Sequence, residues 1–311
     1  MGIKLLSSFI KTYCKSVIVE KHLSCFYGKT ITIDVSIYMY RYKNENALIE
    51  KIYLMCSLFK YYKINAIFVF DGKTPDEKKQ TIINRRNERN EAIEKLNEIK
   101  KLIEKNPKLI YNYKSIIDDL KKKTVKITNS DIQIVKSIIE YTGLNFVIAN
   151  GEAEKLCAEL VLSKIAFSCL SEDTDLFVYS CTHVFRYISL ANHKIIFYDT
   201  KKIFQHLQLT KDEFITICLL SGNDYYNGNK NIYYYYKMML RFKNKNIVEK
   251  TFLEWILEKK IINQDGLDEF YKNKSMYKVN KLDPSQFKYK TKQTDYDKLK
   301  PILIQDNFIF P

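Results

Sequence analysis

The stretch AIFVFD at residues 66–71 is a continuous apolar run, rich in β-branched and aromatic side chains, that ends in an aspartate. Two more stretches share this form, namely ITID at residues 31–34 and AFSCLSED at residues 166–173. An apolar run without alternation is typical of a strand buried on both faces, as in a parallel sheet. We therefore predict that all three stretches are strands, each followed by acidic residues.

Helical patterns lie between these strands. Apolar residues recur at helical spacing in three segments, 47–62, 131–141 and 153–162. One more strand is predicted at 144–148, and a hairpin at 183–190 with 194–198. This alternation predicts an α/β fold with a mostly parallel central sheet and helices on both faces.

The composition favours a polyanionic partner. Lys and Arg number 51 and Asp and Glu 36 among 311 residues, which gives a formal net charge of +15. Such an excess usually accompanies binding to nucleic acid or to an anionic membrane surface. Lys, Ile, Asn and Tyr are all abundant, as in the products of AT-rich genomes, so the positions of the charges matter more than their number.

Several classes of protein are disfavoured. The seven cysteines form no CxxC pair and the four histidines no HxxxH pair, which argues against a disulfide framework and a zinc site. No apolar run approaches about 18 residues, and the N-terminus carries no signal-peptide core. We expect an intracellular, reducing compartment and no membrane partner.

Residues 71–126 are highly charged, with 16 Lys and Arg against 10 Asp and Glu. Their helical pattern is polar on most faces and is broken at Asn106-Pro107, so we expect an exposed segment. Farther along, the chain is rich in Tyr, Lys and Asn. Helices are predicted near 233–242 and 247–259, and residues after about 270 carry no clear pattern.

Seven carboxylates are expected to face one crevice. Open α/β sheets bind ligands at the carboxyl ends of their strands, and here acids follow predicted strands, begin the next helix or, for Asp224, lie just past another helix. The seven are Asp34, Asp71, Glu152, Glu154, Asp173, Asp175 and Asp224. Glu152 and Glu154 are two positions apart, so both reach one site only if Glu152 precedes the regular turns of its helix.

Clustered acids on a basic chain indicate metal-dependent phosphodiester hydrolysis. Acids repel one another, and Mg²⁺, which prefers oxygen ligands, relieves the repulsion. Two such ions can stabilise the attacking and leaving oxygens of a phosphodiester. Each acid alone also has a structural explanation, because Asp and Glu commonly cap turns and helices. Asp173-Thr174-Asp175 is also similar to the nucleophile motif of haloacid-dehalogenase-type phosphatases, so a phosphatase acting through Asp173 stays open.

With these motifs the sequence resembles the flap endonuclease family, the structure-specific 5′ nucleases of xeroderma-G type. The similar motifs occur in family order over about residues 1–240. They are Met1-Gly2-Ile3, DVS at 34–36 with Tyr40, VFDGK at 69–73, GEAE at 151–154 with Cys157-Ala158, SEDTDL at 171–176 and LSGNDY at 220–225.

The resemblance implies a division of the chain and an activity. Residues 1–225 would form a nuclease core in which residues 76–126 are a helical arch, and residues 226–311 a reduced helical DNA-binding region. The activity would be that of a 5′ flap endonuclease and 5′–3′ exonuclease on branched DNA with a 5′ single-stranded end, in replication, repair or recombination. The seven carboxylates would hold two Mg²⁺ ions, for which Mn²⁺ can substitute.

The resemblance also implies roles for single residues. Lys78 and Arg85 would steer the scissile phosphate and act with Asp173 in catalysis. Arg86 would contact DNA, Tyr40 would stack on a base, and Gly2 would pack near the active site. Without the resemblance, Lys78 and Arg85 would be an ordinary solvated helix face, and one of 24 tyrosines would be ordinary core or surface.

Two departures from the family are visible. The family's Gly-Ile-Gly turn, which grips duplex phosphates around a monovalent cation, is replaced by Asn231-Ile232-Tyr233 and three further tyrosines. Tyrosine adopts left-handed backbone poorly and blocks close approach, so duplex binding is expected to be rebuilt or weakened. The sliding-clamp peptide is degenerate in Gln305, Phe308 and Phe310, so no sliding clamp is expected as a partner.

Three other functions stay open. They are a non-catalytic DNA-binding or scaffold protein with the nuclease fold, a Holliday-junction-type resolvase of the same superfamily, and an RNase of the related PIN-like architecture. The arch-like insertion and the Asp224 motif argue against the RNase. The oligomeric state is not predicted, although symmetric junction cleavage would need two active sites. The composition suits a large cytoplasmic DNA virus or an AT-rich eukaryote, so we expect a nucleus or a cytoplasmic viral replication site.

Overall fold

A computed structural model of the chain describes residues 2–73, 78–245, 249–287, 289 and 291–305. Within these ranges the strands form one seven-stranded sheet in the order β1-β7-β6-β5-β2-β3-β4. Their bounds are β1 Ile18–His22, β2 Thr30–Asp34, β3 Asn65–Phe70, β4 Asn145–Ile148, β5 Ser168–Leu170, β6 His183–Ser189 and β7 Lys194–Asp199. No helix in these ranges is long and apolar enough to span a bilayer.

The five strands from β6 to β4 are parallel, whereas β7 runs antiparallel to both β6 and β1. The predicted parallel strands and the predicted hairpin are therefore confirmed. Strands β2 and β3 are buried except at their first residues, as their unbroken apolar runs require, whereas the edge strand β4 is only half buried. In register, Ile33 of β2 lies opposite Phe68 of β3 and Leu170 of β5, so the three carboxyl ends coincide.

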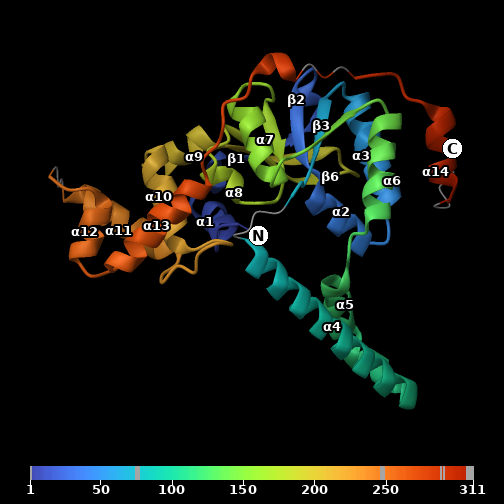
Figure 1. Cartoon of the computed structure of the whole chain (residues 1–311), viewed down its shortest axis with the longest axis horizontal. Helices are drawn as coiled ribbons and strands as arrows, with labels where there is room; N and C mark the ends of the chain where they lie inside the picture. Colours follow the sequence, from blue (N-terminus) through green and yellow to red (C-terminus); the bar gives the residue numbers. More distant parts are fainter. Residues whose placement is uncertain (1, 74–77, 246–248, 288, 290, 306–311) are drawn as a thin grey trace.

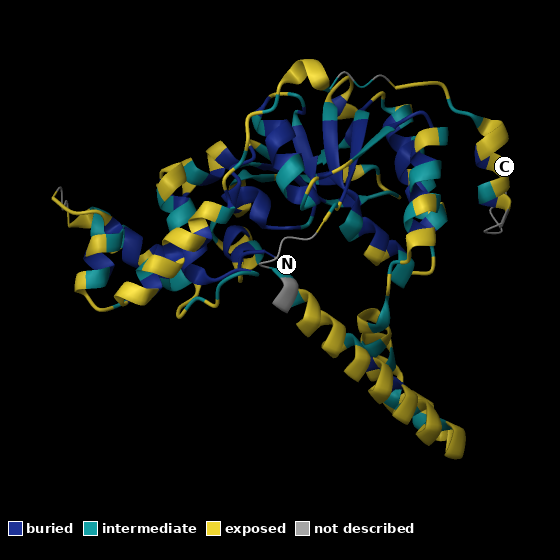
Figure 2. Cartoon of the chain, viewed as in Figure 1, coloured by how far each residue is buried: buried dark blue, intermediate teal, exposed yellow. Residues whose placement is uncertain are grey.

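Helices cover both faces of the sheet, as predicted (Figures 1 and 2). One hydrophobic core lies under α1 (Leu6–Tyr13), α7 (Ala153–Leu162), α8 (Asp175–Val178), α9 (Thr200–His206) and α10 (Lys211–Ser221). The other lies under α2 (Val35–Asn44), α3 (Leu48–Tyr61), α6 (Asn129–Tyr141) and α14 (Tyr296–Gln305). The sheet is thus the middle layer of three.

The charged segment is a helical hairpin that projects from the core (Figure 1). It consists of α4 (Lys79–Lys105) and α5 (Ile110–Thr124), which are joined through a short turn at Pro107–Leu109. Most of its surface is exposed (Figure 2), and Ala92 and Leu96 are the buried residues among those of the hairpin whose side chains the structure describes. The predicted break at Asn106-Pro107 is confirmed, and we call this hairpin the arch. Residues 74–77, at the start of the predicted insertion, lie outside the described residues.

The region after residue 225 contains α11 (Ile232–Asn244), α12 (Phe252–Glu258) and α13 (Gln264–Met276). The prediction of a helix over 247–259 was wrong at its start, because Thr251 and Glu254 form a capping box that begins the helix at Phe252. Residues 246–248 lie outside the described ranges. After α13 the chain crosses the top of the sheet in Figure 1 and packs α14 on α6.

Candidate active site

Four of the seven predicted carboxylates are buried at the carboxyl ends of the central strands. Asp34 ends β2, Asp173 lies in the loop after β5, Asp175 begins α8 and Glu154 lies in the first turn of α7. None of these residues is more than 8% exposed. Four acids beyond the reach of bulk water, on four different elements, are an unusual use of a protein interior.

The loop after β5 aims its acids through local hydrogen bonds. The Ser171 hydroxyl donates to Asp34 Oδ2 at 2.8 Å and accepts from the Asp173 backbone N–H at 3.1 Å. Asp173 Oδ1 in turn accepts from the Asp175 backbone N–H at 2.9 Å. Hydrogen bonds within the Ser-x-Asp-x-Asp segment therefore fix the carboxylates of Asp173 and Asp175, and its serine joins the segment to Asp34.

Asp71 combines a structural role with a place in the cluster. Its Oδ1 accepts from the Ala153 N–H at the start of α7 at 2.9 Å, and its Oδ2 accepts from the Ser36 hydroxyl at 2.5 Å. Glu152 is the N-cap of α7 and has extended backbone, φ −80° and ψ 138°. Glu152 therefore precedes the regular turns, which is the condition for Glu152 and Glu154 to reach one site.

Two cations at the base of the arch contact the acids. The Lys78 ammonium is paired with Glu152 and lies 3.3 Å from Glu154 Oε1. Seven residues along α4, Arg85 Nη2 lies 3.0 Å from Asp224 Oδ2. The structure thus brings the predicted cations and acids together. Their ion pairs attach the arch to the acidic cluster.

The other predicted residues lie around this cluster. Gly2 has φ +78°, and a Cβ on it would lie 2.3 Å from Asp173 Oδ1 and 2.8 Å from Asp175 Oδ1. The N-terminal segment therefore touches the acids with no room for a side chain. Tyr40 is half exposed on α2, and Arg86 is exposed on α4.

Burial and mutual repulsion raise the pKa values of the buried acids. Burial, and next the charges of Glu154 and Asp71, hold the pKa of Asp34 well above its usual range. Burial raises the pKa of Glu154 to about 7, although the Lys78 charge lowers it. Burial, Asp173 and Glu154 raise the pKa of Asp175 in the same way. These carboxyl groups therefore form one electrostatic cluster that attracts cations.

The acids suit a hard divalent cation. All the donors are carboxylate oxygens, and Asp175 Oδ1 is buried without a hydrogen-bond partner among the described residues. Within those ranges no three acidic, histidine or cysteine side chains form a ready-made metal site. The Lys78 ammonium instead lies against Glu152 and Glu154. The site as it stands is closed on a protein cation, and its donor chemistry fits a metal ion.

Sequence reasoning missed two tyrosines that hold these acids. Tyr225 donates to Glu152 Oε2 at 2.6 Å, and Tyr277 donates to Asp175 Oδ2 at 3.0 Å. Tyr225 directly follows Asp224, so the motif LSGNDY offered a signal for it. Nothing in the local sequence marks Tyr277.

The segment that departs from the family pattern caps α11 and packs it against α1. Asn231 has extended backbone and caps α11, accepting from the Tyr234 N–H at 3.1 Å. The rings of Tyr233 and Tyr236 meet Phe9 of α1 edge-on, at 5.4 and 5.2 Å between centroids. These tyrosines therefore attach α11 to α1.

Comparisons with known proteins agree with this geometry. The family model described as XPG N-terminal domain matches residues 1–92, and that described as XPG I-region matches residues 143–224. Flap endonuclease 1 of Theileria annulata is 30% identical over 94% of this chain and 65% of its own length. A probable RAD2-like endonuclease of Invertebrate iridescent virus 6 is 28% identical over 75% of this chain and 68% of its own. The chain spans 62–65% of the length of the first few of these relatives.

Solved structures share the fold at low identity. The catalytic core of Rad2 in complex with DNA substrate has a TM-score of 0.70 at 20% identity, over 98% of this chain and 95% of that one. The flap endonuclease-1 from Methanococcus jannaschii has a TM-score of 0.62 at 16% identity, over 98% and 93%. Human GEN1 in complex with Holliday junction DNA has a TM-score of 0.61 at 16% identity, over 98% and 73%.

Proposed function

Because the chain belongs to the flap endonuclease family, we propose that it is a divalent-metal-dependent nuclease that cuts branched DNA near a free 5′ single-stranded end. A single observation carries this proposal. Buried acids at the carboxyl ends of parallel strands cluster with Glu154, and two cations at the base of a projecting helical hairpin contact Glu154 and Asp224 beside them. Such a site combines affinity for cations with affinity for phosphate.

The acids would hold two Mg²⁺ ions, for which Mn²⁺ can substitute. The residues are Asp34, Asp71, Glu152, Glu154, Asp173, Asp175 and Asp224. When bound, such ions activate water and stabilise the leaving oxygen of a phosphodiester. The protein contributes the positions of the ligands, which the Ser171 and Ser36 hydroxyls and the start of α7 hold in place.

Lys78 and Arg85 would exchange partners when substrate binds. In the structure they neutralise Glu152, Glu154 and Asp224. Cations taken up by these acids would free the ammonium and guanidinium groups, which would then contact the scissile phosphate. Arginine suits this task because its guanidinium can donate to two oxygens at once. The arch would thus close on the substrate through the same side chains that contact the acids in the structure.

The surface around the site suits single-stranded DNA. Tyr40, half exposed on α2, offers a ring on which a base can stack. Arg86 and the charged outer face of α4 offer phosphate contacts along the path of a 5′ strand. We infer a role in replication, repair or recombination, where branched DNA with free 5′ ends arises.

The test uses end-labelled 5′-flap, 3′-flap, duplex and four-way-junction DNAs, with Mg²⁺ or with EDTA. We expect incision of the 5′ flap near the junction, lost in EDTA and in Asp173→Asn. Asp118→Asn, which neutralises an exposed acid on α5, serves as the matched control and should retain activity. Preference for the four-way junction would recast the protein as a resolvase. DNA binding without cleavage in Mg²⁺ or Mn²⁺ would overturn the nuclease proposal in favour of a DNA-binding protein.

A further inference from the structure

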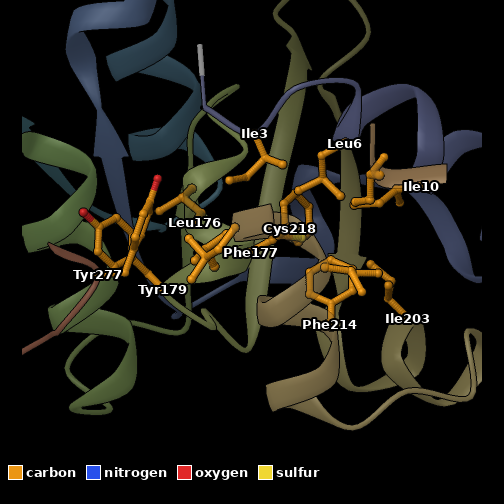
Figure 3. Packing of buried hydrophobic residues seen from close by; sticks show 14 of the residues in the cluster. Ile3, Leu6, Ile10, Leu176, Phe177, Tyr179, Ile203, Phe214, Cys218 and Tyr277 are labelled. Carbon is orange, nitrogen blue, oxygen red and sulfur yellow. The ribbon is translucent and has the colours of Figure 1, made fainter. Parts of the chain in front are cut away.

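Tyr277 links the C-terminal helices to the acidic cluster. It follows α13 directly and lies outside both segments that match the family models. Its side chain is buried, and its hydroxyl donates to Asp175 Oδ2 at 3.0 Å. Figure 3 shows its ring beside that of Tyr179, and the two centroids are 5.1 Å apart. The ring is thus fixed by packing, which fixes the direction of the hydroxyl.

The two oxygens of Asp175 have different surroundings. Oδ2 accepts from Tyr277, whereas Oδ1 is buried without a hydrogen-bond partner in the described part of the chain. Oδ1 points to the place where Asp173 Oδ1 also lies, since a Cβ on Gly2 would come within 2.8 Å of both atoms. A buried carboxylate with one oxygen held and the other free is oriented toward a cation.

Helix α13 also touches the other segments that carry acids. Asn273 Oδ1 accepts from Asn223, the residue before Asp224, at 3.0 Å. Beyond Tyr277, the Asn280 backbone N–H donates to Glu159 of α7 at 2.9 Å. Helix α13 is therefore fastened to Asn223, and the segment that follows it is fastened to α7.

We propose that Tyr277 is a positioning residue, whose hydroxyl holds Asp175 so that its free oxygen faces the divalent-cation site. The C-terminal helical region is then a structural part of that site. Tyr225, whose ring centroid lies 6.1 Å from that of Tyr277, holds Glu152 in the same way, and the two form a pair of adjacent tyrosines beside the acids. Hydrogen-bond partners of metal ligands typically contribute about 10- to 100-fold in metal affinity. The inference rests on the metal site of the proposed function but does not require cleavage.

The test compares Tyr277→Phe with Tyr235→Phe. Both remove one hydroxyl from a buried ring of the C-terminal region, but the Tyr235 hydroxyl has no hydrogen-bond partner among the described residues. Mn²⁺ binding is measured on the full chain without DNA, by electron paramagnetic resonance and calorimetry. We expect the Kd for Mn²⁺ to rise about tenfold in Tyr277→Phe and to stay unchanged in Tyr235→Phe. In an Asp175→Asn background, Tyr277→Phe should have no further effect.

Three outcomes would overturn the inference. They are unchanged Mn²⁺ affinity in Tyr277→Phe, absence of Mn²⁺ binding to the unmodified chain, and loss of a cooperative thermal transition in Tyr277→Phe, which would make the hydroxyl a folding contact. Cleavage assays separate this inference from the nuclease proposal. Mn²⁺ binding that depends on Tyr277, in a chain that cuts no DNA, would support the positioning role and overturn the nuclease.

Discussion

The loop after β5 and the helix α13 both position acids of the site, but over very different distances along the chain. In the loop, Ser171, Asp173 and Asp175 bond to one another across two residues each. The bond from Tyr277 to Asp175 spans 102 residues, and that from Asn280 to Glu159 spans 121. The loop is a local motif that orients its own acids, whereas α13 and the residues after it act on segments 102 and 121 residues away.

The loop also differs from the C-terminal helix α14 in what it contributes to stability. The loop gathers like charges in a buried site, which opposes folding, whereas the C-terminal segment supplies apolar packing, with Leu299 and Leu303 fully buried against the core. Function and stability are thus concentrated in different places. Five substitutions test whether function and stability reside in different parts of the molecule.

The largest effect is expected for Asp173→Asn. Removal of one charge from the site should lower kcat at least about 1,000-fold, since a bound metal contributes several kcal/mol to the transition state. The same substitution should raise the Tm of the metal-free protein, because it relieves burial of a repelled carboxylate. Cleavage assays and calorimetry check the two signs. A fall in Tm would show that the loop stabilises the fold.

Leu299→Ala should lower the stability of the protein and leave its activity unchanged. Truncation of a fully buried leucine in α14 should lower the free energy of unfolding by about 2–5 kcal/mol. At a temperature where the variant is folded, kcat should equal that of the unmodified chain. Urea unfolding and cleavage at 15 °C below the variant's Tm test this pair of outcomes, and Ile304→Ala, at an exposed position of the same helix, is the control.

Lys78→Ala should lower kcat about 100-fold, because the ammonium would otherwise contact the transferred phosphate. Lys114→Ala removes an exposed cation from α5 and should change only the salt dependence of binding. Single-turnover rates at saturating protein distinguish the two. Equal effects of both substitutions would mean that the arch attracts DNA without acting at the scissile bond.

Gly2→Ala should lower cleavage about tenfold, because the new methyl group would push Asp173 and Asp175 from their positions. Gly28→Ala separates this effect from backbone strain, since Gly28 also has a positive φ of 70° but has open space around it. The Mg²⁺ concentration for half-maximal rate should rise only for Gly2→Ala. If the two variants behave alike, contact with the acids is not the cause.

The smallest effect concerns pH. The pKa of Glu154 is raised from 4.5 to about 7, so the folded metal-free protein keeps a proton that the unfolded chain loses above pH 4.5. The stabilising contribution is therefore full below that pH and is lost as pH rises toward 7. Relative to Glu154→Gln, the unmodified chain should lose a few °C of Tm across this window. Mg²⁺ at pH 8 should restore it, and identical pH profiles would contradict the assignment.

The contrast also explains what could be predicted from sequence. The strands, and the acids Asp34, Asp71 and Asp173 that end or follow them, could be predicted because strand and acid are adjacent in sequence. The start of α12 was missed because apolar spacing does not mark where a helix begins. The capping pair Thr251 and Glu254 sets that boundary. Strand β1, which pairs with β7 along its full length, has an ordinary mixed sequence that only its partner makes into a strand. The contact of Tyr277 could not be predicted, because its hydrogen-bond partner Asp175 lies 102 residues earlier in the chain.

The crossing of the chain from α13 to α14 has a consequence for protein synthesis. Leu299 and Leu303 complete a core whose other members, from Leu23 to Phe197, leave the ribosome much earlier. The side of α6 that α14 covers thus stays exposed until α14 has been translated. A polypeptide interrupted before that point lacks both the covering helix and, if it ends before residue 277, the tyrosine behind Asp175. Such an interrupted chain would carry the acids of the site without the hydroxyl that we propose positions Asp175.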